Sequence, residues 1–589
     1  MTATATLTNS CSAVGTINIV NNTKFFESST STAWTTAANW KPGNTVPDAD
    51  KCVVIKTPVV INADTNALAR NIKIEKNGAT GKLTINGSLT VTDGITNTGL
   101  AEDFIVKSDA NLKQINEDPN LNTTPISVRR LFTWSDDLRK EYNYLASPVK
   151  GQNMKTLFGV TTNTPFALVL RESTNTFVNA AAADYEQPGK GFAVKEPAKS
   201  LGGGGDIADI EGEFKGVPNN GTFTTPITKT MASRGWNLIG NPYPSNLDLH
   251  EFYQNNSTKI LPEFRFWDNR MNNTYVQYGG AYQGYSYAIY NAASDEGNPA
   301  PGGDPGNNSS DPTPTADVGG LYRYAKVGQG FVVRANASTY PSTLHLEYKN
   351  TQRTSMQPDR GFFGRNDIQK DRYRLQLITP DALTLTQTIL YIPNGLNSVG
   401  LEDSKHPSTN ASDAFYSMEE TSKLLINAKA PFQITDKVPL GNNHFIAGVY
   451  KIRAVNRLGI FANGQAIYLK DKQLNVITDL TQSDYTFTSE AGEFTNRFEI
   501  VYENGSVLAT DATTKASWEV YRDAADFVIR SSDKSIEMMQ LYDASGRLIL
   551  SQKGNGKELR FPATGLAEGM YIVKIRLKDG QEFTKKIRK

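Results

Sequence analysis

Short runs of alternating apolar and polar residues follow one another along almost the whole chain, and they restrict its fold more than any other feature. One such stretch, residues 71–99, reads NIKIEKNGATGKLTINGSLTVTDGITNTG. Polar turn residues separate the runs, and these apolar pairs are expected to point inward: Ile72 and Ile74, Leu83 and Ile85, and Leu89 and Val91. A period of two residues is that of a β-strand, and helical periodicity is scarce. The sequence therefore predicts an all-β protein.

Length and charge narrow the class of protein further. A chain of 589 residues is too long for one hydrophobic core and predicts several domains. Its 61 basic and 60 acidic residues give a net charge of +1. This balance argues against a nucleic-acid-binding protein, because such proteins carry an excess of lysine and arginine. No apolar run reaches the roughly 18 residues needed to cross a bilayer.

The first residues, MTATATLTNSCSAVG, lack the basic start and the apolar core of a signal peptide. We therefore expect that a signal has been removed or that the chain is the C-terminal fragment of a longer protein. The Thr/Ala-rich start favours the fragment.

The chain has two cysteines, Cys11 and Cys52. Such low usage fits a large secreted protein that relies on its hydrophobic core rather than on a disulfide framework. We predict a disulfide between Cys11 and Cys52, and two free buried thiols are the alternative.

Residues 1–118 hold short apolar runs with polar turns at short intervals, which predicts a solenoid-like β ladder or a stacked β-sandwich. Asp48 and Asp50 in this region could bind calcium. Two carboxylates are few ligands for that ion, so we favour a solvated turn and predict no metal.

Residues 125–350 contain a duplication of one β unit, with copy one at 125–230 and copy two at 231–350. Four short motifs recur in the same order, which is hard to obtain by chance. The pairs are NYLASP (143–148) with NLIGNP (237–242), NTFV (175–178) with NTYV (273–276), GKGFAVK (189–195) with GQGFVVR (328–334), and EFK (213–215) with EYK (347–349).

Copy two carries an insertion at 277–320, between its second and third motifs. The first half is rich in tyrosine, and the second half is rich in Gly, Pro, Asp and Asn and predicts an irregular loop. Aromatic side chains with a polar tip suit sugar or protein surfaces. The candidate ligand-binding residues are Trp267, Tyr275, Tyr282, Tyr285 and Tyr287. The alternative is that these rings pack the insertion onto its parent sandwich.

Residues 360–503 predict an antiparallel β-sandwich, with residues 413–427 as a candidate short helix. A linker at 504–517 precedes a closing domain at 518–589. In that domain, MYIVKIRL alternates, KDGQ is an Asp-Gly hairpin turn, and EFTKKIRK returns as a last strand. Six or seven short strands in so few residues predict an immunoglobulin-like β-sandwich.

Three motifs of this closing domain occur in order: LYDASGRLI (541–549), GLAEGMYIVKI (565–575) and KKIRK (585–589). On these motifs the domain resembles the type A C-terminal sorting domain of the type IX secretion system of gliding and oral Bacteroidetes. The stretch WNLIGNPYPS (236–245) is also similar to the body of large flavobacterial surface proteins that end in such domains.

The resemblance implies export across the outer membrane and partners for each step. The translocon and its outer-membrane shuttle barrel would recognise the domain, a cell-surface sortase would remove it, and lipopolysaccharide would anchor the cargo. The implied recognition residues are Asp543, Gly546, Arg547, Gly569, Tyr571, Lys585, Lys586 and Lys589. The local excess of basic residues would steer docking to an acidic receptor. The alternative is that lysines on a terminal edge strand prevent aggregation.

No motif in the sequence indicates catalysis. None of the four histidines, His250, His345, His406 and His444, stands at metal-ligand spacing with another His or Cys. The GKGF and GQGF motifs precede strands, so we interpret their glycines as bulges or tight turns rather than as a phosphate loop.

We therefore predict a non-enzymatic protein with no cofactor. It would be secreted to the cell surface, associated with the outer membrane, and adhesin-like or involved in gliding motility. Two other functions stay open. One is a module that binds surface glycans through the aromatic insertion. The other is a secreted polysaccharide hydrolase, because paired carboxylates cannot be recognised from sequence spacing.

Overall fold

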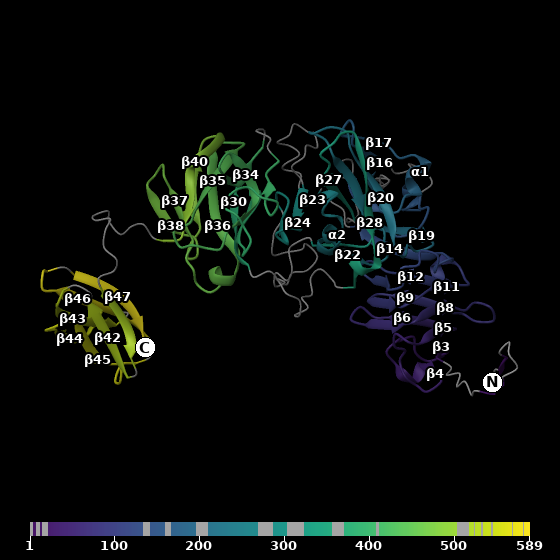
Figure 1. Cartoon of the computed structure of the whole chain (residues 1–589), viewed down its shortest axis with the longest axis horizontal. Coiled ribbons are helices and arrows are strands. Elements are labelled where there is room, and N and C mark those ends of the chain that lie inside the picture. Colours follow the sequence, from purple (N-terminus) through teal and green to yellow (C-terminus); the bar gives the residue numbers. More distant parts are fainter. Residues whose placement is uncertain are drawn as a thin grey trace, which may run out of the picture. The chain divides into compact units, whose positions relative to one another are not determined.

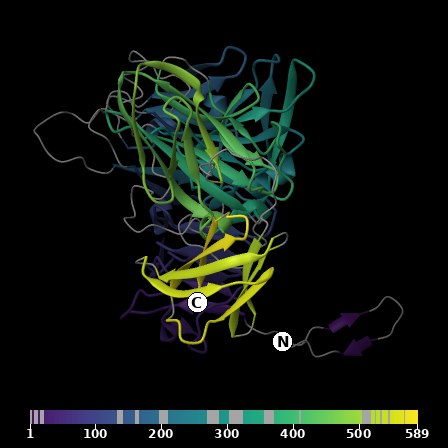
Figure 2. The same ribbon diagram turned by 90° about the vertical axis from the view of Figure 1, so that its left-hand side faces the viewer.

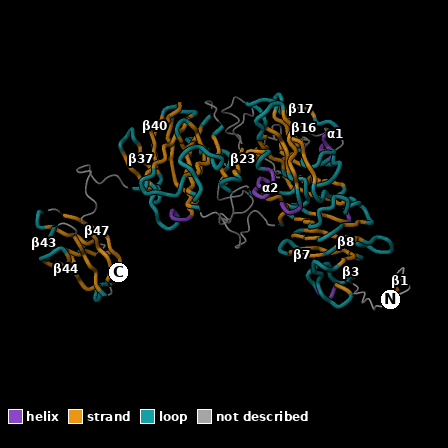
Figure 3. The backbone as a smooth tube through the Cα atoms, in the orientation of Figure 1, coloured by secondary structure: helices purple, strands orange, loops and turns teal. Residues whose placement is uncertain are grey.

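The chain divides into two compact units, Met1–Asn504 and Gly505–Lys589. Strands make up most of the ordered elements and the helices are few and short, as Figure 3 shows. The predicted all-β class is confirmed. The computed structural model describes residues 4–6, 12–14, 22–132, 142–159, 166–195, 210–268, 287–302, 323–355, 370–407, 412–503, 518–523, 525–531, 534–543, 546–567, 569–580 and 582–589.

In the first unit, a two-stranded sheet of β1 (Thr4–Thr6) and β2 (Ser12–Val14) is followed by a β-solenoid of three sheets, whose strands stack in Figure 1 (purple). Strands of successive turns pair in parallel register, so each inward side chain stacks on the equivalent side chain of the previous turn. Val53, Ile72 and Ile95 form one such column. The first sheet contains β3 (Thr23–Phe26), β4 (Trp40–Lys41), β5 (Cys52–Ile55), β8 (Asn71–Ile74) and β11 (Ile95–Asn97). The second contains β6 (Pro58–Ile61), β9 (Lys82–Ile85) and β12 (Phe104–Val106); the third contains β7 (Asn66–Ala69), β10 (Ser88–Val91) and β13 (Asn111–Gln114).

Aromatic side chains close the N-terminal end of the solenoid core. The rings of Trp34 and Trp40 lie 4.7 Å apart, and Phe26 lies 5.0 Å from Trp40. The Trp40 indole N–H donates to the Trp34 carbonyl at 2.7 Å. A stack of repeats needs such a cap, because its last turn would otherwise expose apolar side chains.

Strand β14 (Ile126–Phe132) belongs to both the solenoid and copy one of the duplication. It pairs in parallel with β12 and antiparallel with β19 (Ile210–Gly216). In copy two, β20 (Phe223–Lys229) pairs with β28 (Ser342–Tyr348) in the equivalent place.

The main sheets of the two copies have the same strand order. In copy one the order is β15 (Tyr142–Ala146), β18 (Gly191–Lys195), β16 (Phe166–Arg171) and β17 (Thr176–Asn179). In copy two it is β21 (Trp236–Gly240), β27 (Gly330–Ala335), β23 (Ile260–Trp267), β24 (Tyr287–Asn291) and the additional β25 (Glu296–Asn298). The NTYV motif lies outside the described residues, and β24 takes the place that β17 holds in copy one.

Matching residues of the two copies bond to each other across an approximate two-fold axis. The Ala146 N–H donates to the Gly328 carbonyl, and the equivalent Gly240 N–H donates to the Gly189 carbonyl, both at 3.0 Å. Each copy therefore bonds to the other copy through the same pair of motifs.

The glycines of the GKGF and GQGF motifs have two roles in this contact. Gly189 (φ +77°) and Gly328 (φ +74°) form the turns that the sequence predicted. A Cβ on Gly191 would lie 2.7 Å from the Ile239 carbonyl oxygen, so this second glycine permits close approach of the backbones. The interpretation of all these glycines as bulges or turns was therefore incomplete.

Residues 370–503 form one continuous sheet of eleven strands within their described part. The sheet curls so that its ends meet, and Phe487 near one end lies 4.8 Å from Phe498 near the other. One pair, β31 with β34, is parallel, so the predicted purely antiparallel sandwich is corrected to a mixed sheet. The strands are β30 (Asp371–Ile378), β31 (Thr384–Tyr391), β32 (Ser404–Lys405), β33 (Ala414–Glu419), β34 (Ser422–Lys429), β35 (Lys437–His444), β36 (Gly448–Leu458), β37 (Tyr468–Asp471), β38 (Val476–Asp479), β39 (Tyr485–Ser489) and β40 (Gly492–Val501).

The helix predicted at 413–427 is wrong, because this segment forms the hairpin β33–β34. Glu420 turns the chain with φ +53°. Both faces of the hairpin are buried: Phe415 and Tyr416, which are neighbours in sequence, are at most 1% exposed. A strand that is covered on both faces loses its alternation of apolar and polar residues, so periodicity cannot distinguish it from a short helix.

The insertion of copy two joins that copy to the eleven-stranded sheet. Glu296 of β25 is buried and accepts hydrogen bonds from Arg374 at 2.5 Å and from Arg372 at 3.2 Å. The side chain of Asn291 donates to the carbonyls of Leu401 and Asp403 at 2.9 Å. The described part of the insertion, residues 287–302, is therefore largely buried structure, and most of the irregular loop predicted for its second half lies outside the described residues.

The second unit is a two-layer sandwich with its own core, seen from two directions in Figures 1 and 2 (yellow). Its buried cluster consists of residues from 518–589 alone and includes Phe561, Leu541 and Val573. One layer contains β41 (Trp518–Asp523), β42 (Asp526–Ser531) and β45 (Glu558–Pro562). The other contains β44 (Leu548–Lys553), β43 (Ile536–Asp543), β46 (Met570–Leu577) and β47 (Glu582–Arg588).

Within the residues that the structure describes, no helix has the length and apolar character of a membrane span.

Candidate functional site

The first motif of the C-terminal unit forms a compact turn between β43 and β44. The Arg547 guanidinium contacts the Asp543 carboxylate at 3.0 Å, and that carboxylate also accepts the Arg547 backbone N–H at 3.0 Å. Gly546 has φ +83°, and its N–H donates to the Asp543 carbonyl at 3.0 Å. The spacing Asp-x-x-Gly-Arg is therefore explained by local bonds, and the Arg547 side chain stays largely exposed.

The second and third motifs meet at the same end of this sheet. Asp543 lies opposite Tyr571 in the β43–β46 ladder, and Tyr571 lies opposite Ile587 in the β46–β47 ladder. The Lys589 N–H donates to the Gly569 carbonyl at 3.1 Å, and the Lys589 ammonium bonds to the Leu566 carbonyl. The structure thus brings together three motifs that are separate in the sequence.

Tyr571 is 7% exposed, and its hydroxyl donates to the Ala567 carbonyl at 2.9 Å. Its ring belongs to the core and its hydroxyl fixes the preceding loop. Tyr571 thus positions the second motif from within the unit, whereas Arg547 presents its charge outward.

Lys585 and Lys586 lie on β47, the edge strand of its sheet, and Lys589 follows this strand. Lys585 is exposed opposite the buried Val573, and the backbone of Lys586 pairs with Ile572. Two nearby cations have acidic partners, since Lys574 contacts Glu582 at 2.7 Å and Arg576 contacts Glu537 at 3.0 Å. An exposed lysine here fits both interpretations, the docking of a receptor and the protection of an edge strand.

The aromatic ligand-binding candidates that the structure describes pack between the two copies. Trp267 stacks on Tyr144 with 6.0 Å between ring centroids, and the hydroxyls of Tyr287 and Tyr144 are hydrogen-bonded at 2.9 Å. Burial raises the pKa of the Tyr287 hydroxyl. These contacts favour the packing alternative for Trp267 and Tyr287. The remaining candidates lie outside the described residues: Tyr275, Tyr282 and Tyr285.

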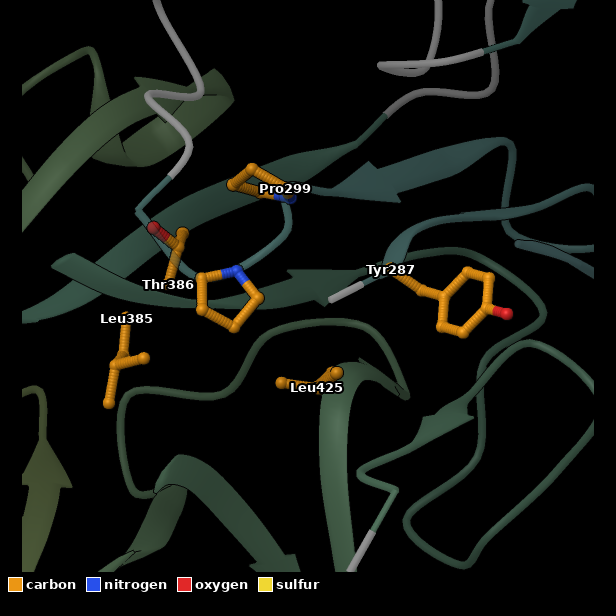
Figure 4. A pocket seen from close by; sticks show the side chains of 6 residues that line it. Tyr287, Pro299, Leu385, Thr386 and Leu425 are labelled. Atoms are coloured by element: carbon orange, nitrogen blue, oxygen red, sulfur yellow. The ribbon is translucent and has the colours of Figure 1, made fainter. Parts of the chain in front are cut away.

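A small cavity lies where the insertion meets the eleven-stranded sheet (Figure 4). Its volume is about 10 Å³, which is room for one water molecule at most. The Tyr287 hydroxyl points away from Pro299 and Leu385 in this view. The cavity is too small for a substrate. Its lining residues are Tyr287, Pro299, Pro301, Leu385, Thr386 and Leu425.

The predicted disulfide and calcium positions lie in the solenoid. Cys52 is half-buried, and its sulfur accepts a weak hydrogen bond from the Asn71 amide at 3.6 Å. Cys11 lies outside the described residues, so the disulfide stays a prediction. Asp48 caps an exposed turn by accepting the Asp50 N–H at 2.9 Å. Among the described residues, no three His, Cys, Asp or Glu side chains gather as metal ligands.

Two of the four histidines are buried in the eleven-stranded sheet. His444 stacks on Tyr450 with 3.7 Å between centroids, and its Nε2 is 2.6 Å from the Asn442 amide. Burial lowers the pKa of His444 to about 4 and that of His406 to about 3. Both rings are therefore neutral at pH 7 and contribute to packing.

The first unit should lose stability on acidification because these histidines resist protonation. Their pKa in the folded state lies below the ordinary value of 6.5, so the unfolded chain binds more protons as the pH falls from 6.5 toward 4. The loss is on the order of 3 kcal/mol per histidine. Urea denaturation between pH 7 and 4.5 measures it.

Burial raises the pKa of Asp403 to about 6, so protonation of this carboxylate stabilises the fold as the pH falls and opposes the effect of the histidines. A histidine variant therefore isolates the histidine contribution. His444→Phe keeps the stack on Tyr450 and should lose less stability than the wild type over this pH range. Equal losses in the two proteins would contradict the prediction.

The fold defines a class of protein in which a β-solenoid leads into a duplicated sandwich and a curled sheet, followed by a separate C-terminal sandwich. Residues 25–502 match a family described as a domain of unknown function, DUF8693, and the chain belongs to this family. Residues 508–588 match a second domain of unknown function, DUF8694.

No curated protein matches the chain. One similar solved structure is a DUF3244 family protein from Bacteroides vulgatus with an immunoglobulin-like β-sandwich fold. It is 12% identical, the match covers 13% of this chain and 85% of that chain, and the TM-score is 0.12.

Proposed function

We propose that the chain is a secreted cell-surface protein whose C-terminal unit is the sorting signal of the type IX secretion system. The first unit is the cargo and serves as a structural, adhesin-like scaffold. The partners of the C-terminal unit are the translocon, the shuttle barrel of the outer membrane and the cell-surface sortase, and lipopolysaccharide is the anchor of the cargo.

One observation supports this function best. The three motifs that carry the resemblance converge at one end of a sheet, where Asp543, Tyr571 and Ile587 lie side by side in adjacent strands. Arg547 and Lys585 are exposed near this end. A receptor could therefore contact all three motifs at once, and the self-contained core of the unit lets it act as a transferable signal.

The test is to fuse residues 505–589 to a fluorescent protein that carries an N-terminal export signal, in a bacterium with this secretion route. We expect fluorescence at the cell surface or in the medium, and retention in the periplasm in a strain without the translocon. If the fusion stays in the periplasm of the intact strain, the proposal fails.

Charge substitutions test which residues the receptor recognises. Replacing Lys585 and Lys589 by alanine should reduce export of the fusion about tenfold or more if the basic end is recognised. The matched control replaces Lys553 and Lys557, two exposed lysines of the same unit outside the three motifs. Equal effects of both pairs would show that only total charge matters.

A further inference from the structure

The duplication allows a surface of copy one to be compared with its equivalent in copy two. Glu213 and Lys215 of β19 correspond to Glu347 of β28 and to Lys349, which directly follows that strand. In copy two, helix α2 (Leu249–Asn256) packs over β28, and its side chains bond to this strand. The Asn256 side chain accepts the Glu347 N–H at 2.9 Å, and these bonds hold the C-terminal end of the helix against the strand.

Asn255 of the same helix bonds to both charged side chains of the Glu347–Lys349 pair. Its amide donates to the Glu347 carboxylate at 3.1 Å, and its carbonyl oxygen accepts from the Lys349 ammonium at 3.3 Å. In copy two the chain itself therefore supplies the polar partner for this Glu–Lys pair.

In the stretch of copy one that is equivalent to this helix, the described residues contain a short turn, Met154–Thr156. This segment is hydrogen-bonded to β19 through one backbone carbonyl and one side-chain amide. The Leu157 carbonyl accepts the Glu213 N–H at 2.8 Å, and the Gln152 side chain accepts the Lys215 N–H at 2.8 Å. The Glu213 carboxylate is bonded instead to Ser127 at 2.5 Å and to Arg129 at 3.2 Å.

A groove of about 550 Å³ lies beside this pair, within the 300–1,000 Å³ typical of small-molecule sites. Polar side chains line one side, and the half-buried Phe158 provides an apolar wall beside the buried Leu157. The lining residues are Arg129, Gly151, Gln152, Asn153, Thr156, Leu157, Phe158, Gly159, Glu211, Glu213 and Lys215.

The charges of the groove are balanced and held in place. Arg129 contacts Glu211 at 3.1 Å and Glu213 at 3.2 Å, and Lys215 contacts Glu213 at 3.0 Å. Burial by itself would raise the pKa of Glu213, but the bonds from Ser127 and Lys215 and the charge of Arg129 outweigh it and lower the pKa. Two bases and two acids thus line the groove as fixed ions.

Such a lining favours a neutral ligand over a charged one. A strongly anionic or cationic ligand would have to break an existing ion pair and would gain little net Coulomb energy. A hydroxyl group can accept from a guanidinium and donate to a carboxylate at the same time, without breaking the pair. The ring of Phe158 adds an apolar surface for the C–H face of a sugar.

We propose that this groove of copy one binds a neutral saccharide. Carboxylate, guanidinium and amide groups bond to its hydroxyls, and the apolar wall contacts its ring. The site is separate from the aromatic insertion, and it does not depend on how the chain is exported.

The test is calorimetric titration of the full chain with neutral trisaccharides: maltotriose, cellotriose, mannotriose, xylotriose and tri-N-acetylchitotriose. We expect at least one of them to bind with a Kd of about 1 mM or lower. Arg129→Gln and Glu213→Gln should each weaken that binding about tenfold or more, because each removes a charged hydrogen-bond partner. Thr156→Trp, at an exposed position of the groove, should abolish it by filling the space.

The duplication supplies the matched control. Glu347→Gln changes the equivalent residue of copy two and should leave affinity unchanged, while thermal melting checks that every variant is folded. The proposal is overturned if none of the trisaccharides binds. It is also overturned if Glu347→Gln weakens binding as much as Glu213→Gln, or if glucose 6-phosphate binds more tightly than all neutral sugars.

Discussion

Replacing Arg353 by alanine should lower the free energy of unfolding of the first unit by about 3 kcal/mol or more. The guanidinium is buried and joins three modules: it donates to the Leu112 carbonyl of the solenoid at 2.6 Å, to Asn220 at the end of copy one at 3.1 Å, and to Ser245 of copy two at 2.8 Å. Its partners are neutral, and burial lowers its pKa to about 10.

The substitution would leave these acceptors buried without a donor and would open a cavity under Tyr243, whose ring lies 4.6 Å from the guanidinium. Guanidinium chloride denaturation followed by tryptophan fluorescence measures the effect. Arg70→Ala is the control, because the Arg70 side chain is exposed and its pair with Asp93 should contribute little to stability. Similar losses in both variants would refute a central role for Arg353.

Glu296→Ala should destabilise the first unit by about 3–5 kcal/mol. The carboxylate is 1% exposed and neutralises a buried cluster of cations, with Arg374 at 2.5 Å, Arg372 at 3.2 Å and Lys370 at 3.7 Å. Its removal takes a negative charge away from these buried cations in a medium of low polarity, which costs more than the loss of a single hydrogen bond.

The position of the cluster makes a second measurement possible. Glu296 belongs to copy two and its cationic partners belong to the eleven-stranded sheet, so its loss should separate the unfolding of these two parts. Limited proteolysis should then release a fragment that begins near residue 370. Glu27→Gln, which alters an exposed pair with Lys56, is the control and should change neither result. An unchanged digestion pattern for Glu296→Ala would contradict this role.

Strand periodicity predicted the fold class and the inward residues of the solenoid, because burial on one face leaves a direct mark on the sequence. Ile72, Leu83 and Leu89 are all at most 1% exposed. Periodicity could not decide between a solenoid and a sandwich, since both need the same alternation and differ only in which strands pair. Periodicity failed for the β33–β34 hairpin, because both of its faces are buried and the alternation of apolar and polar residues is lost.

Motifs predicted candidate residues better than they predicted contacts. The motif carrying Asp543 and the motif carrying Tyr571 were visible in the sequence, whereas their adjacency depends on the register of a ladder between distant strands. Tyr571 was a candidate for recognition, and its burial gives it a packing role. Glu296 was not a candidate in the sequence, because its burial depends on a partner sheet more than 70 residues away.

The groove of copy one left one trace in the sequence. Copy two has LHEFYQNN, which forms helix α2, whereas the equivalent stretch of copy one differs in sequence and its described residues contain only the short turn Met154–Thr156. A difference between repeats therefore indicates where a repeat has specialised, and a comparison of motifs alone does not show it.

Strand β14 has a consequence for the dynamics of the first unit. It is bonded to the solenoid through β12 and to copy one through seven residue pairs with β19. Its amide hydrogens can reach solvent only when both neighbours open, so they should be among the slowest of the chain to exchange with deuterium. A protein built as a row of modules would then behave at this junction as a single cooperative folding unit.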